Sequence, residues 1–347
     1  MNGPAARRGS GARREPPVWR RIDLGACPPL RAQAFAESVA HAVGAGEAPN
    51  TLLFARPDAP YISLGFHQSF AEEIDPDFAA RRPVPVIRRV EGGGTTWLDP
   101  DQGFYQLVYR PDPDAAAGPE ELGRLLRPVA AAARARGVPL TLRPPSDLVI
   151  HGRKISGNAG GDWDGARIVV GGILGRADRD RMADLLRLPH PGLRPIVRAE
   201  LARWITSWAE ETGHEFDWAA LADAVAAAYA QAGLFRTRRA EPLPSEEAHF
   251  RRETVPRHTE TAWRELAPIP RAGSGPMRRL RIAGPHGILV FPGPTPGSLR
   301  VATVDGAEVR DALALGPSPT ARPRRLPPGS PAFSALAAAV RGGPGFD

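Results

Sequence analysis

The stretch HGRKISGN, residues 151–158, contains the only lysine in a chain of 347 residues, Lys154. Since Lys and Arg together number 45, the other 44 (45 − 1) are arginines. Arginine carries a wide planar fork, whereas lysine carries a compact ammonium on a slim stem. Because arginine fills every other basic position, the one position that keeps lysine is expected to need a compact charge at the end of a long, slim side chain. We predict that Lys154 is catalytic; the alternative is a lysine placed by chance on a solvated face.

The residues around Lys154 predict a strand with one polar face. Side chains alternate along a strand, so Lys154, Ser156 and Asn158 share that face while Ile155 enters the core. An ammonium there is suited to holding a carboxylate and a phosphate together, and to neutralising charge as the carboxylate attacks phosphorus. The alternative interpretation is a hairpin with a polar surface.

A second motif, RRVEGGGTTW, occupies residues 88–97. Three glycines after a predicted strand offer backbone N–H groups and room for an anionic ligand. The paired arginines add bidentate donors for phosphate or carboxylate. This is not a Walker loop, because no Gly-Lys-Ser/Thr follows at the required spacing. A flexible hairpin loop is the alternative. Trp97 adjoins the glycines, and we predict that it walls an apolar ligand tunnel.

Together the two motifs resemble the lipoate–protein ligase family, including its octanoyl-transferring relatives. The match comprises Arg-Arg-x-x-Gly-Gly-Gly at 88–94 followed by Asp99, then Asp147 and Gly-Arg-Lys-Ile-Ser-Gly at 152–157. The segment 61–68 is similar to the early strand of that family, which ends in Gly and Gln. The resemblance spans about residues 31–235.

The resemblance implies an α+β fold with mixed β-sheets flanked by helices. It implies an ATP-dependent ligase that converts lipoate, octanoate or a similar medium-chain acid to acyl-AMP. The acyl group then passes to a lysine of a lipoyl carrier domain, either a 2-oxoacid dehydrogenase E2 or a glycine cleavage H-type protein. Mg²⁺ would enter with ATP.

By the same resemblance, Lys154 holds the carboxylate and the α-phosphate, and Asp147 lies near the adenylate or the incoming amine. The predicted nucleotide- and acyl-binding residues are Arg89, Gly92, Gly93, Gly94, Thr95, Thr96, Trp97, Asp147, Ser156, Gly157, Asn158 and Gly172. No metal site is expected from a protein motif, because the histidines at 67, 151, 190, 214, 249, 258 and 286 lack metal-ligand spacing.

Three positions depart from the family pattern. Leu98 and Gly171 stand where the family often has histidines, and Gln102 stands where many members have asparagine. Two alternatives therefore stay open: an ATP-independent octanoyl or lipoyl acyltransferase, and a non-catalytic paralogue that binds acyl groups or carriers. The acyltransferase relatives commonly use a cysteine nucleophile. The sole cysteine, Cys27, lies in a predicted turn far in sequence from both motifs.

Charge and composition set the remaining expectations. The net charge is +7, but residues 1–21 and 271–347 carry the positive excess and flank a mildly acidic body. We therefore expect no nucleic-acid partner. No apolar run approaches a membrane span, and the basic start lacks an apolar signal stretch, so we expect a cytoplasmic protein with no membrane partner.

Breaks in composition divide the chain into three parts. We predict a disordered basic arm at 1–18, a catalytic domain at 19–238 and a small C-terminal accessory α+β domain at 245–347. Successive strands are expected at 140–142, 148–150, 154–158 and 167–174, with a turn at 160–162.

Overall fold

The structure is a computed structural model that describes residues 15–82, 84–112, 118–266 and 278–342. In this part of the chain, a mixed sheet follows the strand order β11-β1-β2-β6-β10-β9-β8-β7. Its strands are β1 (Val18–Cys27), β2 (Thr51–Pro57), β6 (Gln102–Tyr109), β7 (Thr141–Arg143), β8 (Asp147–Ile150), β9 (Arg153–Trp163), β10 (Ala166–Leu174) and β11 (Arg236–Arg239). The β1 strand runs parallel to β2 and β11, and the other pairs are antiparallel.

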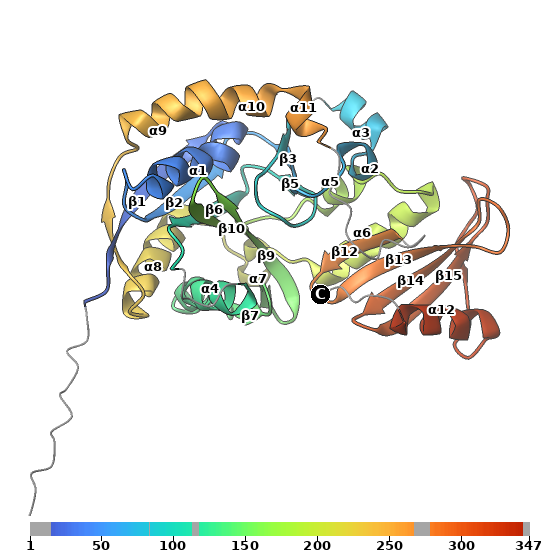
Figure 1. Ribbon diagram of the computed structural model, residues 1–347. Helices are drawn as coiled ribbons and strands as arrows, with labels where there is room; N and C mark the ends of the chain where they lie inside the picture. The colour runs from blue at the N-terminus through green and yellow to red at the C-terminus, as the bar shows by residue number, and fades with distance from the viewer. Residues whose placement is uncertain (1–14, 83, 113–117, 267–277, 343–347) are drawn as a thin grey trace, which may run out of the picture.

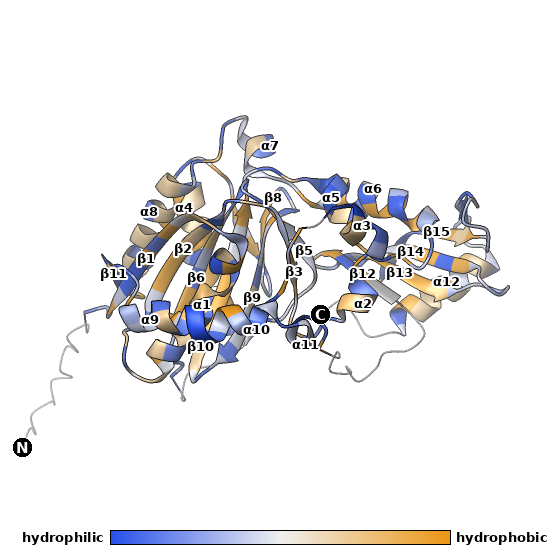
Figure 2. Ribbon diagram, turned by 90° about the horizontal axis from the view of Figure 1, so that it is seen from above, coloured by the Kyte–Doolittle hydropathy of each residue, from blue (hydrophilic) through white to orange (hydrophobic). Residues whose placement is uncertain are grey.

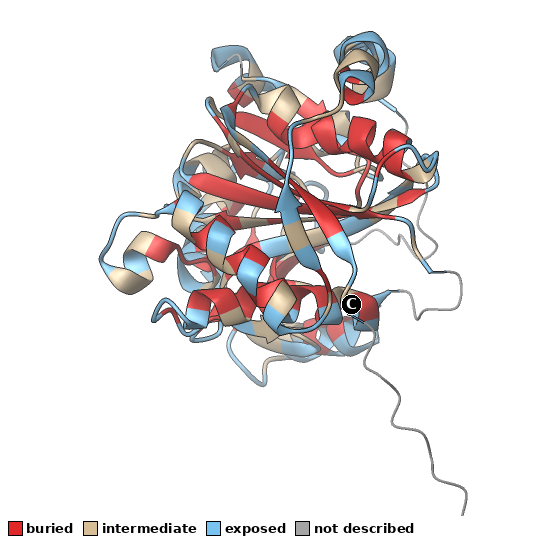
Figure 3. Cartoon of the chain, turned by 90° about the vertical axis from the view of Figure 1, so that its left-hand side faces the viewer, coloured by how far each residue is buried: buried red, intermediate tan, exposed pale blue. Residues whose placement is uncertain are grey.

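Helices cover both faces of this sheet, as Figures 1 and 3 show. Alternation along β2 explains why: Leu52 and Phe54 face one apolar cluster, while Leu53 and Ala55 face the other. The first cluster is closed by α4 (Pro119–Arg134) and α8 (Trp218–Gln231), and the second by α1 (Pro29–Gly44). Figure 2 shows the apolar character of the strands between them.

A small sheet of order β4-β3-β5 carries the glycine motif. Its strands are β3 (Tyr61–Leu64), β4 (Val86–Arg88) and β5 (Thr96–Leu98), with α2 (Phe70–Glu73) and α3 (Pro76–Arg81) between β3 and β4. The glycines therefore form the connection from β4 to β5. The helices after β10 are α5 (Arg179–Asp184), α6 (Arg194–Trp204) and α7 (Trp208–Thr212), with a 3₁₀ turn at Pro191–Leu193.

Residues 244–266 form a helical strap across α1, drawn in orange in Figure 1. The strap comprises α9 (Pro244–His249), the π-helical turn η2 (Phe250–Thr254), α10 (Val255–Thr259) and α11 (Thr261–Arg264). Phe250 joins the α1 cluster, and Arg20 pairs with Glu246 in the strap. The predicted boundary at 245 thus falls at the start of a segment that packs on the predicted catalytic domain, residues 19–238, which we call the catalytic body.

A second sheet of order β12-β13-β14-β15-β16 forms the C-terminal part. Its elements are β12 (Arg278–Ala283), β13 (His286–Pro292), β14 (Leu299–Asp305), β15 (Glu308–Leu315), β16 (Arg324–Arg325) and α12 (Pro331–Arg341). One face packs on α6 and the residue after it: Val197, Leu201 and Ile205 share an apolar cluster with Ile288 and Val301. The other face carries α12.

Most predicted elements are present, with three differences. The arm expected at 1–18 lies mostly outside the described residues, and β1 already begins at Val18. Cys27 ends that strand rather than lying in a turn. The turn predicted at 160–162 is wrong: Gly160 and Gly161 lie inside β9, and the chain reverses at Asp164 and Gly165, both with positive φ. Paired to β10, the glycines can stay extended.

Candidate active site

Lys154 lies on β9 and forms an ion pair with Asp147 on the neighbouring strand β8. The Lys154 Nζ atom is 2.7 Å from Asp147 Oδ1, and the two side chains are 23% and 8% exposed. Arg143 on β7 donates to the other carboxylate oxygen at 3.0 Å. Burial acts to raise the pKa of Asp147, but Lys154 and Arg143 outweigh it and hold the pKa below its usual value. The carboxylate therefore stays charged and fixes the ammonium.

Gly157 provides the space that the lysine side chain occupies. A Cβ atom at position 157 would lie 3.1 Å from both Cε and Nζ of Lys154. The backbone of Lys154 is also held, because its carbonyl accepts from the Thr206 N–H at 2.8 Å, and Ile205 forms an isolated bridge with it. The lysine is thus positioned from both its side chain and its main chain.

The glycine loop lies against the same strand, β9. The N–H of Gly92 donates to the carbonyl of Gly160 at 3.4 Å, and a Cβ at Gly93 would lie 3.8 Å from the Cβ of Ala159. A Cβ at Gly92 or Gly94 would meet no atom within 4 Å. The structure therefore brings the two sequence motifs together, with open space above two of the three glycines.

The paired arginines differ from the anion-binding donors expected from the sequence. Arg89 directs its five N–H groups to the Ser63 carbonyl and hydroxyl and to the carbonyls of Gly92 and Gly94. Arg88, 1% exposed, donates to backbone carbonyls on two segments: Gly65, Phe66 and Gln68, and Trp263, Arg264 and Leu266. Both guanidinium groups are occupied by protein acceptors: Arg89 shapes the glycine loop, and Arg88 joins residues 65–68 to residues 263–266.

Comparisons with known proteins show the family of the chain. Residues 28–230 match the model of the lipoyl protein ligase A/B catalytic domain. The chain belongs to this family. It is 29% identical over 236 residues to the octanoyltransferase LipM of Symbiobacterium thermophilum, covering 62% of this chain and 86% of that protein. It is 32% identical over 100 residues to the lipoate-protein ligase LplJ of Bacillus subtilis, covering 29% of each.

Solved structures share the fold. A bipartite lipoate protein ligase of Thermoplasma acidophilum, studied with its E2 lipoyl domain, superposes with a TM-score of 0.64 at 18% identity, covering 74% of this chain and 98% of that one. Lipoate-protein ligase A bound with ATP gives a TM-score of 0.60 at 19% identity, covering 72% and 98%. The α+β class with mixed, helix-flanked sheets is thereby confirmed, and a further C-terminal sheet is present.

Gly171, which the resemblance places at a family histidine position, has its surroundings filled from β6 and β9. A Cβ at Gly171 would overlap the Tyr105 hydroxyl and the Asn158 amide, which are hydrogen-bonded to each other. Asn158 also donates to the carbonyl of Ser146 at 2.7 Å. A Cβ at the neighbouring Gly172 would lie 2.8 Å from the Phe104 ring. Both glycines are therefore required by packing, and Asn158 is part of a hydrogen-bonded group with Tyr105.

The threonines and the tryptophan after the glycines have distinct places. Thr95 donates to Gln68 Oε1 at 2.8 Å, and the Gly65 N–H donates to the same oxygen at 3.1 Å. Thr96 begins β5 and is exposed. Trp97 is buried in an apolar cluster with Ile62 and Phe78, and its Nε1–H donates to Asp99 at 2.9 Å. Trp97 is thus a core residue of the small sheet, and the ligand tunnel stays a prediction.

Sequence reasoning missed two charged groups near the motifs, the half-buried Arg143 and the buried Glu91. Arg143, which holds Asp147, precedes the pair Pro144-Pro145 and carried no motif signal. Glu91 lies within the glycine motif, is 2% exposed, and its Oε2 atom has no hydrogen-bond partner. Burial, and then the charge of Glu37, raise the pKa of Glu91 to about 7, while Arg89 opposes them. The sequence did place this acid between an arginine pair and three glycines, a position that could have marked Glu91 as a residue to examine.

The sole cysteine lies in an environment that lowers the reactivity of its thiol. Cys27 is 5% exposed and packs in the apolar cluster under α1. Burial is the main cause that raises the pKa of its thiol to about 11. A thiol in this environment carries little thiolate at neutral pH and is a poor nucleophile.

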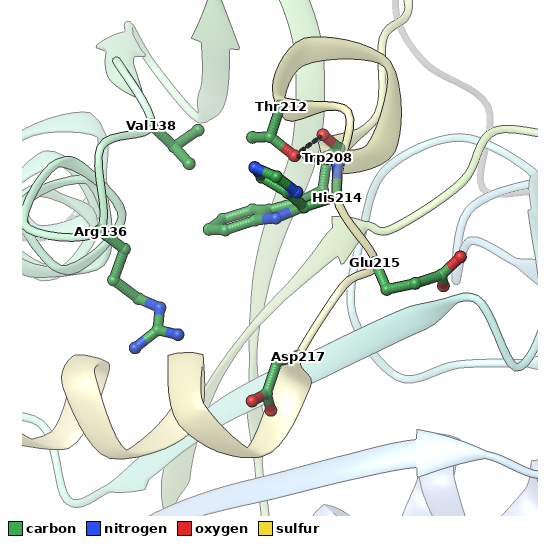
Figure 4. A pocket seen from close by; sticks show the side chains of 7 residues that line it. All are labelled: Arg136, Val138, Trp208, Thr212, His214, Glu215 and Asp217. Carbon is green, nitrogen blue, oxygen red and sulfur yellow. Dashed lines mark hydrogen bonds between the residues drawn. The ribbon is translucent and has the colours of Figure 1, made fainter.

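A cavity of about 170 Å³ lies elsewhere, where the segment after α4 meets α7 and the start of α8 (Figure 4). Its walls include Arg136, Trp208, His214 and Asp217, and Thr212 donates to the Trp208 carbonyl there. Ligand pockets are usually about 300–1,000 Å³. The cavity is too small for a nucleotide, and its described lining contains none of the predicted site residues.

In the described residues no helix has the length and apolarity needed to cross a membrane.

Proposed function

We propose that the protein is an ATP-dependent ligase that activates lipoate, octanoate or a similar medium-chain acid as acyl-AMP. The acyl group is then transferred to a lysine of a lipoyl carrier domain, of the E2 or glycine cleavage H type. In the first step a carboxylate oxygen attacks the α-phosphorus and pyrophosphate leaves. In the second step the carrier amine attacks the acyl carbonyl, AMP leaves and the amine releases a proton.

Lys154 supports the first step through its charge and position. Asp147 at 2.7 Å keeps its ammonium oriented, and its partial exposure leaves it reachable by substrate. When a carboxylate and the α-phosphate both contact Nζ, the ammonium neutralises charge that develops as the new P–O bond forms. Asp147 acts in this scheme as the group that positions Lys154.

The glycine loop supports nucleotide binding. Arg89 ties the carbonyls of Gly92 and Gly94 back towards β3, which fixes the loop before any ligand arrives. The open positions at Gly92 and Gly94 leave room for ATP or the acyl chain close to the backbone. Mg²⁺ would be carried in by the nucleotide, and we assign it no protein ligand.

One observation favours the ligase over direct acyl transfer: the burial of Cys27. Transferase relatives commonly hold the acyl group as a thioester, which needs a reactive thiolate. Cys27 is the only cysteine in the sequence, and its pKa is raised to about 11 in an apolar core. A free acid activated by ATP requires no such nucleophile.

The test compares two acyl donors on one acceptor, a purified lipoyl domain followed by intact mass. The first reaction contains free lipoate or octanoate with Mg²⁺-ATP and also measures pyrophosphate release. The second contains an octanoylated carrier protein without ATP. We expect acylation and pyrophosphate only in the first reaction. Acylation only in the second would replace the ligase with an acyltransferase.

The acyltransferase is the second candidate, because LipM proteins are among the curated relatives with the longest matches. A non-catalytic acyl- or carrier-binding paralogue is the third, supported by Leu98 and Gly171 at the family histidine positions. If neither donor acylates any lipoyl domain while the protein binds octanoate or a carrier, the protein is the non-catalytic binding paralogue.

A further inference from the structure

Three potential metal ligands meet on the face of the molecule where the strap crosses α1. His41 lies in the last turn of α1, Asp164 in the β9–β10 turn, and His249 at the end of α9. One ligand atom from each lies within 4.8 Å of the others. The sequence separations of 123 and 208 residues (164 − 41 and 249 − 41) hide this group from any motif search.

The backbone around this cluster is shaped to bring the ligands together. Asp164 has a φ of 47° and Gly165 a φ of 78°, so the turn between β9 and β10 is tight. Gly44 lets that turn approach α1, because a Cβ there would overlap the Asp164 carbonyl. On the strap side, His249 immediately precedes the π-helical turn η2. Such turns are often found at functional sites.

The three side chains lie close to one another. His41 Nδ1 is 3.2 Å from Asp164 Oδ2, and the His41 and His249 rings stack with centroids 4.2 Å apart. His249 Nδ1 is 3.2 Å from the Ser38 hydroxyl, a contact that fixes the ring and leaves Nε2 available. Metal-bound histidines usually make such a second hydrogen bond. His41 and Asp164 are 49% and 41% exposed, so an ion can enter and keep water ligands.

We propose that His41, Asp164 and His249 bind a divalent first-row transition metal ion, represented by Zn²⁺, which links the strap to the catalytic body. Two imidazoles and a carboxylate form a mixed nitrogen and oxygen ligand set that suits Zn²⁺, with water completing the coordination. Mg²⁺, which prefers oxygen ligands, fits this set poorly.

The surrounding charges are compatible with a cation. Burial, and then the proximity of His41, lower the pKa of His249, which favours the neutral imidazole that binds metal. Glu253 is a further nearby negative charge. Arg257 is the opposing cation, and its guanidinium is paired with the buried Glu37.

The site would make the strap sensitive to metal. The strap supplies the carbonyls of Trp263, Arg264 and Leu266 that hold Arg88, next to the glycine loop. An ion that joins His249 to α1 and to the β9–β10 turn therefore stabilises a segment connected to the active site. Zn²⁺ would raise protection of residues 244–266 without taking part in acyl transfer.

The experiment titrates Zn²⁺ into untagged, chelator-treated protein without ATP, and follows binding by calorimetry and strap protection by hydrogen exchange. We expect one equivalent of Zn²⁺ per chain and slower exchange in 244–266. His41→Gln, His249→Gln and Asp164→Asn should each weaken binding at least tenfold and abolish the protection. Asparagine tolerates positive φ, so Asp164→Asn keeps the turn while removing the charge.

The matched control is His214→Gln, an exposed histidine outside the cluster. It should bind Zn²⁺ like the wild type, and Mg²⁺ should not replace Zn²⁺ in any variant. The proposal is overturned if the wild type binds no more Zn²⁺ than the His41→Gln and His249→Gln double variant. It is also overturned if binding leaves the exchange of 244–266 unchanged. Because no substrate is present, neither outcome depends on the ligase proposal.

Discussion

At the scale of single residues, Lys154 shows why the two basic side chains are not equivalent here. Its Nζ lies between Asp147 and the bare backbone of Gly157. A guanidinium is planar and wider, so it would press against Gly157 or turn away from Asp147. The arginine immediately before it, Arg153, instead reaches Glu210 and Glu211 on α7.

Lys154→Arg should therefore reduce acid-dependent pyrophosphate exchange by about 10²–10³-fold, equivalent to roughly 3–4 kcal/mol of transition-state stabilisation. The thermal midpoint should remain close to that of the wild type. Arg153→Lys is the matched control and should keep near-normal exchange, because its partners lie in α7. Near-normal exchange in folded Lys154→Arg would remove Lys154 from the mechanism.

Glu91 predicts a pH dependence of stability. Its pKa is raised from 4.5 to about 7 in the folded protein. Between these values the folded state holds a proton that the unfolded chain has released. The free energy of unfolding that the protonated Glu91 contributes is therefore fully present below pH 4.5. It decreases as the pH rises to about 7 and is lost above that pH. The loss amounts to about 3 kcal/mol, from 2.5 pKa units at 1.36 kcal/mol each.

Glu91→Gln should flatten this profile, because glutamine stays neutral throughout. Denaturant unfolding of both proteins at pH values from 4.5 to above 7 measures the difference. Glu120→Gln, an exposed acid at the start of α4, should keep the wild-type slope. If Glu91→Gln also keeps that slope, Glu91 is not the protonated group.

Cys27→Ala should leave carrier acylation unchanged and lower the free energy of unfolding by about 1 kcal/mol, since only a small buried group is lost. The thiol is buried with a raised pKa, so it should also react slowly with alkylating reagents in the folded protein. Acylation assays and intact mass of the enzyme after exposure to an octanoylated carrier check both points. An acyl group trapped on Cys27 would support the acyltransferase.

At the scale of elements, the strap and the glycine loop are joined through Arg88. The guanidinium links carbonyls before α2 to carbonyls at the end of α11, and Trp263 Nε1–H donates to the Arg88 carbonyl at 3.0 Å. A buried arginine is tolerated because backbone acceptors replace its water. The strap therefore completes the framework of the small sheet.

Trp263→Ala should destabilise the protein by about 1–3 kcal/mol and lower pyrophosphate exchange, because it loosens the strap over the loop. The lost contacts include the Arg88 carbonyl and the rings of Trp163 and Phe66. Glu265→Gln is the control: this exposed acid pairs with Arg264 at the surface, so the change should stay below about 0.5 kcal/mol. Equal effects of the two variants would contradict the coupling.

At the scale of the whole molecule, the C-terminal sheet shares an apolar cluster with the α5–α6 region of the catalytic body. Leu201 and Ile205 of the body pack with Ile288 of the sheet, and the Trp204 ring stacks on His286 with centroids 3.4 Å apart. The same segment continues to Thr206, whose N–H binds the Lys154 carbonyl. The sheet is thus coupled by packing to the strand that carries the lysine.

Removing residues 278–347 should therefore lower the thermal midpoint and reduce both pyrophosphate exchange and carrier acylation. Each large aliphatic side chain exposed on α6 forfeits about 1.5–3 kcal/mol of burial. A chain ending at residue 342 should behave like the full-length protein. A truncated protein that keeps the wild-type midpoint and exchange would show that the catalytic body is self-sufficient.

The sequence by itself determined the family, the fold class and the residues to examine. Local patterns carried that information: the strand predicted at 167–174 corresponds to β10, and the single lysine marked β9. Glycine occurs both in turns and in extended strands, and the local sequence predicts a turn at Gly160 and Gly161. Only pairing with β10 decides that they are extended.

Only the tertiary structure decided what the charged side chains contact. Arg88 and Arg89 look like anion-binding donors in the sequence, yet their acceptors come from segments up to 178 residues away. The grouping of His41, Asp164 and His249 likewise requires α1, the β9–β10 turn and the strap to be packed first. Hydrogen bonding and burial depend on distance in space, and a sequence records only distance along the chain.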